Sequence, residues 1–345
     1  IVADSFDQDA LRNLARRTRV VLTTVGPYAL YGSALVEASV KEGTHYCDLA
    51  GEVQWIRKMI DQHLERAQQT GARIVHCCGF DSVPMDIGVW FLQEEAKKRH
   101  GAYCESITML VKATKGAASG GTIASMVNLI QESRQDRETA RVLVNPYSLN
   151  PDGERRGPDS RDQQGVVFDE NAKAWTAPFV MASVNTKVVR RSHALAGYPY
   201  GKDFRYQEAV MTGSGVAGWL KGATMTLGIG GLVLGASFSP TRKFLQNFVL
   251  PEPGEGPDRE MQQKGFFNLM QIGVLPDGTL LRSRVTGDQD PGYGSTSKML
   301  SECAVCLAKD DIQVGGGVWT PASAMARPLL KRLTENACLT FELRD

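Results

Sequence analysis

The sequence predicts an α/β protein, with part of a Rossmann-type parallel sheet followed by an α+β domain that contains an antiparallel sheet. Short β-branched runs at 20–25, 45–50 and 72–78 are separated by helical segments. This alternation is typical of parallel βαβ units, whose ligands bind beyond the carboxyl ends of the strands. The later runs at 266–274 and 279–285 flank a Pro-Asp-Gly turn, which indicates an antiparallel hairpin.

The helices between the first runs have clear ends. A helix at 33–42 stops at Gly43, and a helix at 53–70, with apolar residues at three- and four-residue steps, stops at Gly71. Glycine is the usual residue at a left-handed helix end. A third helix follows Pro84, so the parallel sheet is predicted from three strands and three helices in alternation.

The turn that would open such a domain is not present before these runs. No Gly-x-Gly-x-x-Gly occurs there, and the chain begins with Ile1 rather than Met. The first half of a nucleotide-binding domain of ordinary size takes about a hundred residues. We therefore expect the phosphate-binding half of the sheet to lie in a segment that precedes Ile1, and this chain to hold the second half; a truncated product is the alternative.

The change of pattern past Tyr103 divides the chain. A long polar segment at 145–174, rich in Pro, Asp, Gly and Arg, is predicted to be an exposed loop. We expect the C-terminal half of a dinucleotide-binding domain at 1–103, an α+β substrate and dimerisation domain at 104–312, and a strand and helix at 313–345 that return to the nucleotide domain. A homodimer is the expected assembly.

Composition excludes several classes of function. The net charge is +1, so the chain has no bulk electrostatic attraction for nucleic acid or for a membrane. Its seven cysteines are scattered, which indicates a reducing compartment and a cytoplasmic protein. Cys303 and Cys306 lack a second pair at zinc spacing, so we predict no metal site.

One segment, 213–238, is unusually apolar. It holds eight glycines and a single charge, Lys221. Three interpretations stay open. The segment could span a bilayer, although its uncharged part is short for that. It could be a buried glycine-rich connection. It could instead form a surface that dips into lipid or lines a tunnel for an acyl chain.

The turns after the first and third runs are the candidate sites of chemistry. Gly26 lets the backbone approach a phosphate or ribose, Pro27 fixes the turn, and Tyr28 can project toward a nicotinamide and donate a proton. An ordinary turn with a packed aromatic ring is the alternative for Tyr28. Asp81 and Ser82 lie at the rim of the sheet, where helix capping is the alternative to catalysis.

The predicted site residues fall into three groups. The catalytic candidates are Tyr28 and Asp81. The free amides of a glycine-rich helix start can hold a carboxylate or phosphate of the substrate. The predicted substrate-binding residues are therefore Ser119, Gly120, Gly121 and Thr122. The residues expected to contact the cofactor are Asp4, Thr24, Val25, Gly26, Pro27, Gly79 and Phe80.

Several of these motifs resemble one known family. The chain is similar to the saccharopine dehydrogenase-like oxidoreductases, and within that group to the trans-acting enoyl reductases of mycobacterial lipid synthesis. The resemblance covers essentially the whole chain in order. The motifs that carry it are Val20–Tyr28 with Tyr31-Gly32, Tyr46–Glu52, Cys78–Asp86, Ser119–Thr122, Val188–Ser192, Pro253–Pro257 and Gly316–Ala322.

The resemblance implies an NADP-dependent reductase of an acyl or polyketide lipid, acting on a substrate carried by another protein. The family opens with an Ala-Thr-Gly-Ala-x-Gly-Phe-x-Gly-like turn that binds the NADP pyrophosphate, and these residues lack it. A vertebrate relative has a similar apolar segment and is associated with lipid droplets. This implies peripheral contact of 213–238 with a membrane or droplet.

Two other functions stay open at this point. One is a saccharopine-type dehydrogenase that acts on an amino-acid imine. The other is a non-catalytic lipid-surface protein on the same fold. The long apolar segment, and the lack of a strong cluster for a dicarboxylate, favour the lipid-like substrate.

Overall fold

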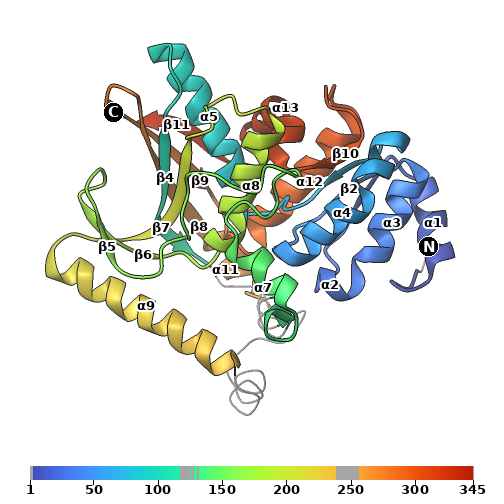
Figure 1. Ribbon diagram of the computed structural model, residues 1–345, viewed down its shortest axis with the longest axis horizontal. Coiled ribbons are helices and arrows are strands. Elements are labelled where there is room, and N and C mark those ends of the chain that lie inside the picture. The colour runs from blue at the N-terminus through green and yellow to red at the C-terminus, as the bar shows by residue number, and fades with distance from the viewer. Residues whose placement is uncertain (1–2, 117–124, 126–127, 130–131, 238–255, 345) are drawn as a thin grey trace.

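Two β-sheets and their helices make up the described part of the chain (Figure 1). The computed structural model describes residues 3–116, 125, 128–129, 132–237 and 256–344. The first sheet is parallel and has the strand order β1-β2-β3-β10. It confirms the α/β fold predicted from the three β-branched runs. Its strands are β1 (Val20–Leu22), β2 (His45–Cys47), β3 (Arg73–Val75) and β10 (Gly317–Trp319).

The helices around this sheet begin and end close to the predicted residues. α3 ends at Gly43 and α4 at Gly71, with φ values of 70° and 80° in the left-handed region. The strands are shorter than the predicted runs because the last residues of each run leave the ladder and form the turns at the carboxyl edge. These helices are α1 (Gln8–Arg16), α2 (Tyr28–Tyr31), α3 (Ser33–Glu42), α4 (Val53–Thr70) and α5 (Val83–His100).

The second sheet has seven strands in the order β11-β9-β8-β4-β7-β6-β5. The predicted hairpin is its β8–β9 pair, but β4 and β7 run parallel, so the sheet is mixed and not wholly antiparallel. A parallel pair needs a long crossover, and this one contains the helices α7 (Arg137–Val144) and α8 (Ala182–Leu195). The strands are β4 (Ser106–Lys115), β5 (Val167–Asp169), β6 (Ala174–Pro178), β7 (Arg205–Gly213), β8 (Phe266–Val274), β9 (Leu280–Gly287) and β11 (Thr340–Arg344).

The C-terminal segment reaches both sheets. β10 pairs with β3 of the parallel sheet, and β11 pairs with β9 of the mixed sheet. Between them α13 packs against α5 and α12, while α12 contacts β1 and β2. The last helices are α11 (Arg259–Lys264), α12 (Gly294–Lys309) and α13 (Pro321–Asn336).

The two sheets share one buried core. Val75 of β3, Leu92 of α5 and Phe267 of β8 belong to the same cluster of buried apolar side chains. α5 contacts β8, β9 and β11 on one side and α8 and α13 on others. The carboxyl edge of the parallel sheet is therefore held at a fixed position against the mixed sheet.

The polar segment 145–174 is less exposed than its composition predicts. Leu149 and Asp159 are buried within it, and its last residues begin the β5–β6 hairpin. The carboxylate of Asp159 accepts a hydrogen bond from Arg190 of α8 at 2.6 Å. Some polar residues of this segment form buried ion pairs and hydrogen bonds within the protein, and others are in contact with water.

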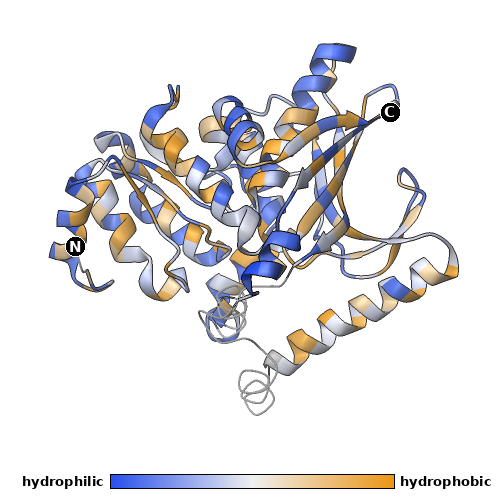
Figure 2. Ribbon diagram, turned by 180° about the vertical axis from the view of Figure 1, so that it is seen from behind, coloured by the Kyte–Doolittle hydropathy of each residue, from blue (hydrophilic) through white to orange (hydrophobic). Residues whose placement is uncertain are grey.

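The apolar segment forms a single long helix, α9 (Gly215–Ser237). Its first turns contact β6 and β7, and the helix then extends along one side of the molecule (Figure 1). The ribbon of α9 is white to orange over most of its length in Figure 2, yet Val216, Leu220 and Leu227 are 75%, 53% and 76% exposed. The structure therefore does not bury this segment as a connection. Among the described residues, α9 alone has the length and composition to cross a membrane.

Candidate active site

A cleft of about 1030 Å³ opens at the carboxyl edge of the parallel sheet. Thr24 and Gly26 follow β1, Gly51 follows β2 and Asp81 follows β3, and all four line the cleft. This edge is where open α/β sheets bind their ligands. The two glycine turns predicted to meet at one edge do so, with the turn after β2 between them. The remaining walls come from the start of α12, the β6–α8 connection and the C-terminal half of α9.

Tyr28 lies at the base of this cleft, with its ring buried. The ring stacks on Trp55 at a centroid distance of 5.4 Å. Its hydroxyl donates to the carbonyl of Thr23 at 3.1 Å and accepts from the backbone N–H of Leu49 at 3.4 Å. Burial raises the pKa of Tyr28 well above its ordinary value, with the negative charge of Asp48 adding to the effect. The hydroxyl therefore holds its proton firmly and joins the turns after β1 and β2.

Two buried carboxyl groups after β2 set the geometry of these turns. Glu52 accepts hydrogen bonds from the N–H groups of Tyr28 and Ala29, at 2.7 and 2.9 Å, and so caps α2. Asp48 accepts from the N–H of Cys77 and lies 2.7 Å from His76 Nδ1. Each carboxyl group therefore connects the turn after β2 to the turn after a neighbouring strand.

Asp81 is the cleft carboxyl group with the simplest surroundings. Its side chain lines the cleft, and burial raises its pKa to about 6. The predicted alternative was helix capping, but the N-cap residue of α5 is Ser82, without a side-chain capping bond. The Ser82 hydroxyl donates to the side chain of Asn185 instead. Within the described ranges, no group hydrogen-bonds to the Asp81 carboxyl, so this carboxyl is open to a ligand.

The turn that carries Asp81 is fixed by α12. Thr296 Oγ1 accepts a hydrogen bond from the N–H of Phe80 at 2.9 Å. A Cβ on Gly79 would lie 3.1 Å from the Cβ of Leu49 and 3.3 Å from the methyl group of Thr296. Glycine is needed at 79 because the turn passes so close to both side chains.

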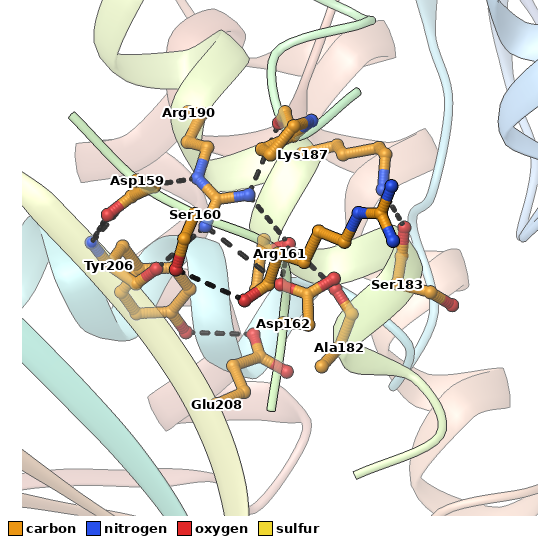
Figure 3. A network of polar contacts seen from close by, with 12 residues as sticks. Asp159, Ser160, Arg161, Asp162, Ala182, Ser183, Lys187, Arg190, Tyr206 and Glu208 are labelled. Carbon is orange, nitrogen blue, oxygen red and sulfur yellow. Dashed lines mark hydrogen bonds and ion pairs between the residues drawn. The ribbon is translucent and has the colours of Figure 1, made fainter. Parts of the chain in front are cut away.

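A buried polar network lies beside the cleft on α8 and β7. In Figure 3 the guanidinium of Arg190 faces Asp159, and the Tyr206 hydroxyl points to Glu208 at 2.9 Å. Burial raises the pKa of Glu208 to about 8, so this group is mostly protonated at neutral pH. The network reaches the cleft at Asp162, which accepts from Thr186 at 3.0 Å. It anchors one wall of the cleft on the mixed sheet.

The predicted cofactor residues divide into those at the cleft and those away from it. Thr24 and Gly26 line it, together with the two catalytic candidates. Val25 is half exposed beside them, and the ring of Phe80 packs on Phe267 in the core. Asp4 accepts from the N–H of Phe6 at the start of the chain and is not among the cleft residues. Pro27 and Gly79 shape the turns, and the predicted substrate residues Ser119, Gly120, Gly121 and Thr122 lie outside the described residues.

The described residues contain no cluster of side chains that could bind a metal ion. Across the residues that the structure describes, no group of three His, Cys, Asp or Glu side chains could hold a metal ion. Cys303 and Cys306 are buried in the core cluster with Cys47 and Cys78. Burial raises the pKa of Cys78, Cys303 and Cys306, and a hydrogen bond with Cys78 together with burial raises that of Cys47, so these thiols stay protonated.

Comparison with known proteins identifies the family. No family model matches the chain. A trans-acting enoyl reductase of Mycobacterium ulcerans (strain Agy99) is 36% identical over 355 residues, which cover 100% of this chain and 85% of that protein. A Mycobacterium tuberculosis (strain H37Rv) protein whose name places it in the same family is 38% identical over 351 residues, 96% of this chain and 82% of its own. The chain belongs to the trans-acting enoyl reductases.

The fold of this enoyl reductase matches a solved structure. Apo saccharopine dehydrogenase (L-Glu forming) from Saccharomyces cerevisiae superposes with a TM-score of 0.52 at 11% identity, covering 100% of this chain and 88% of that one. The likeness confirms the predicted saccharopine dehydrogenase-like fold and carries nothing further. Membership of the enoyl reductase family makes the protein an oxidoreductase, and this class implies a nicotinamide cofactor.

The residues at the cleft fit the nicotinamide end of such a cofactor. Gly26 and Gly51 lie in the turns after β1 and β2 at the rim, and a Cβ on Gly51 would come within about 4 Å of Met181 and Val184. Leu22 lines the cleft, is 40% exposed and offers an apolar contact to a flat ring. No Gly-x-Gly-x-x-Gly stands before β1 in this sequence.

Proposed function

We propose that the protein reduces the carbon–carbon double bond of an α,β-unsaturated acyl thioester, belonging to a lipid or polyketide chain, with NADPH as the reductant. One observation carries the proposal. The Asp81 carboxyl lines the cleft at the carboxyl edge of β3, has a pKa of about 6, and is free of hydrogen-bond partners among the described residues. A carboxyl group of this kind is suited to general acid catalysis near neutral pH.

The reaction needs a hydride and a proton. When bound, the nicotinamide supplies the hydride that forms the new C–H bond at the β-carbon. The turn at Thr24–Gly26 positions the ring, and Asp81 gives its proton to the α-carbon, where the second C–H bond forms. The double bond is thereby reduced, and the Asp81 carboxylate recovers a proton from water that enters the open cleft.

Tyr28 is the alternative proton donor. Its hydroxyl donates to the carbonyl of Thr23, so it would have to give up this bond before it could donate to a substrate. Its raised pKa also makes it the weaker acid of the two. The geometry favours Asp81 as the acid and Tyr28 as the residue that holds two turns together.

The lining of the cleft supports an acyl substrate. Apolar residues come from the β6–α8 connection, from α12 and from α9, and include Phe179, Val184, Leu300 and Ile229. An apolar cleft of this size suits an alkyl chain, with polar groups reserved for the reacting end. The relatives' name, trans-acting, supports a substrate presented by a separate protein. The saccharopine-type alternative would call for charged groups that hold an amino acid.

A lipid surface is the second partner in this proposal. The apolar stripe of α9, defined as Val216, Trp219, Leu220 and Leu227, is exposed at steps that place these residues on one helix face. An exposed apolar face of this kind marks a contact surface. Its contact with a membrane or lipid droplet would place the cleft beside the pool of acyl chains.

The direct test is reduction of a decenoyl thioester of N-acetylcysteamine, monitored by nicotinamide absorbance and by mass spectrometry of the product. We expect the saturated decanoyl thioester, with NADPH preferred to NADH. Asp81→Asn should lower kcat by about a hundredfold or more, the usual worth of a general acid. Tyr28→Phe tests the alternative acid. A decrease in kcat of less than about threefold would show that Tyr28 is a packing residue and not the proton donor. No reduction, with NADPH binding intact, would overturn the proposed reaction.

A further inference from the structure

α9 takes part in the cleft along one face of its C-terminal half. The cleft-lining residues of the helix are Thr226, Ile229, Gly230, Val233 and Leu234. They follow the three- and four-residue steps of a single helix face. α9 is therefore the wall of the cleft that faces the turns of the parallel sheet, and most of its contribution is apolar.

The N-terminal half of α9 explains why this wall stays in place. A Cβ on Gly218 would lie 2.3 Å from the carbonyl oxygen of Gly213, and one on Gly222 would lie 3.2 Å from Thr212 and Val166. Thr212 Oγ1 also donates to the carbonyl of Gly218 at 2.8 Å. These two glycines let the helix pack closely on β7 and on the segment before β5.

Three glycines in the C-terminal half of α9 have no such packing reason. A Cβ on Gly228, Gly230 or Gly231 would meet no other described atom within 4 Å, and none of the three has a positive φ. Glycine weakens a helix relative to any unbranched residue. Of these three, Gly230 alone lines the cleft, where the absence of a side chain leaves space open.

We propose that α9 is the acyl-binding wall of the cleft and that Gly230 determines how long an alkyl chain the protein accepts. The inference rests on the proposed function, which supplies an acyl thioester as substrate. The reacting end lies beside Asp81 and the turn after β1, and the alkyl tail runs along the α9 wall between Ile229 and Val233. A side chain at 230 would project into the path of the tail.

Gly230→Leu tests this assignment, with Gly230→Ala as a graded step. Gly228→Leu is the matched control, because residue 228 lies on the face of α9 opposite the cleft-lining residues and is not among them. Both leucine variants raise helix propensity equally. Binding of saturated butyryl and decanoyl thioesters of N-acetylcysteamine is measured by calorimetry on the purified chain without cofactor, so no reduction is involved.

We expect Gly230→Leu to weaken decanoyl binding by about tenfold or more, and butyryl binding by less than about twofold, as a pocket that loses room for methylene groups should. The decanoyl affinity of Gly230→Ala should lie between those of Gly230→Leu and the unchanged protein. Gly228→Leu should bind both thioesters with the affinity of the unchanged protein. Equal effects on the two chain lengths, equal effects of both leucine variants, or no chain-length preference in the unchanged protein would overturn the inference. Because these ligands are already saturated, a failure of enoyl reduction would leave this result standing.

Discussion

Burial raises the pKa of Asp81, Asp86 and Glu208 to about 6, 7 and 8, but the three side chains have different surroundings. Asp86 accepts from Ser192 and from the N–H of Ala322, and so joins α5 to α8 and α13. Glu208 accepts from Tyr206 and Asn185, while the Asp81 carboxyl faces the cleft. The same desolvation therefore acts on structural groups at two positions and, at the third, on the carboxyl group that we propose as the acid.

The first prediction concerns the pH dependence of Asp81. An acid catalyst must be protonated in the free enzyme, so kcat/KM should be greatest below about pH 6 and should fall by about tenfold per pH unit above it. Asp81→Asn should remove this dependence as well as lower the rate. Initial rates of decenoyl thioester reduction across pH, at saturating NADPH, measure both effects. A variant that keeps the same pH profile would show that another group titrates.

The second prediction concerns Glu208 and stability. A carboxyl whose pKa is raised on folding binds more protons in the folded state, so its contribution to stability is lost as pH rises between its unfolded and folded pKa values. Glu208→Gln, which mimics the neutral acid, should lessen this loss by up to about 1.4 kcal/mol per pH unit between about pH 5 and 8. Urea unfolding of both proteins at several pH values measures the free energy of unfolding. An equal change of this free energy with pH in both proteins would contradict the prediction.

Residue positions at the cleft could be predicted from the sequence where they follow a strand. Thr24, Gly26 and Asp81 line the cleft because the carboxyl ends of parallel strands share one edge. Asn185 and Thr296 hold the Asp81 turn from α8 and α12, which are distant in sequence. No local pattern marks such partners, because the folding of both sheets brings them together.

At the scale of elements, helix ends were predictable and the environment of α9 was not. Gly43 and Gly71 end their helices by a local backbone preference that the sequence carries. The apolar pattern at 213–238 left open a buried connection, a surface that dips into lipid or lines an acyl tunnel, and, although its uncharged part is short, a bilayer span. The distinction depends on what packs on each face, and α9 packs on β6 and β7 at one end and lines the cleft with the other.

The third prediction tests the apolar stripe of α9. Burial of apolar surface contributes about 25 cal/mol per Å², so a few hundred Å² in lipid gives measurable partitioning. We expect the protein to float with phosphatidylcholine vesicles, and the double variant Leu220→Glu/Leu227→Glu to stay behind because charge is costly in the apolar phase. Val144→Glu, at a 51% exposed residue of α7, is the matched control and should float. Equal flotation of all three proteins would exclude lipid contact through this stripe.

At the scale of the whole molecule, the shared core joins the parallel and mixed sheets into one unit. Leu92 of α5 is fully buried in the cluster that also contains Val75 of β3 and Leu269 of β8. Arg191 of α8 adds polar links to the parallel sheet. Its guanidinium donates hydrogen bonds to the carbonyl of Val318 in β10 and to the carbonyl of Leu149. The position of the cleft therefore depends on packing far from its walls.

The last prediction follows from this shared core. Leu92→Ala removes a buried side chain and should lower the free energy of unfolding by about 2–5 kcal/mol. Because the cavity would form between the sheets, amide exchange should speed up in β3 and in β8 by the same factor when exchange requires global unfolding. Leu30→Ala, at a side chain that is 50% exposed, is the control and should change stability by less than about 0.5 kcal/mol. Peptide-resolved hydrogen exchange under mildly denaturing conditions measures both strands in one experiment. Loss of protection in one sheet alone would mean that the sheets unfold separately, and that the cleft lies between two units rather than within one.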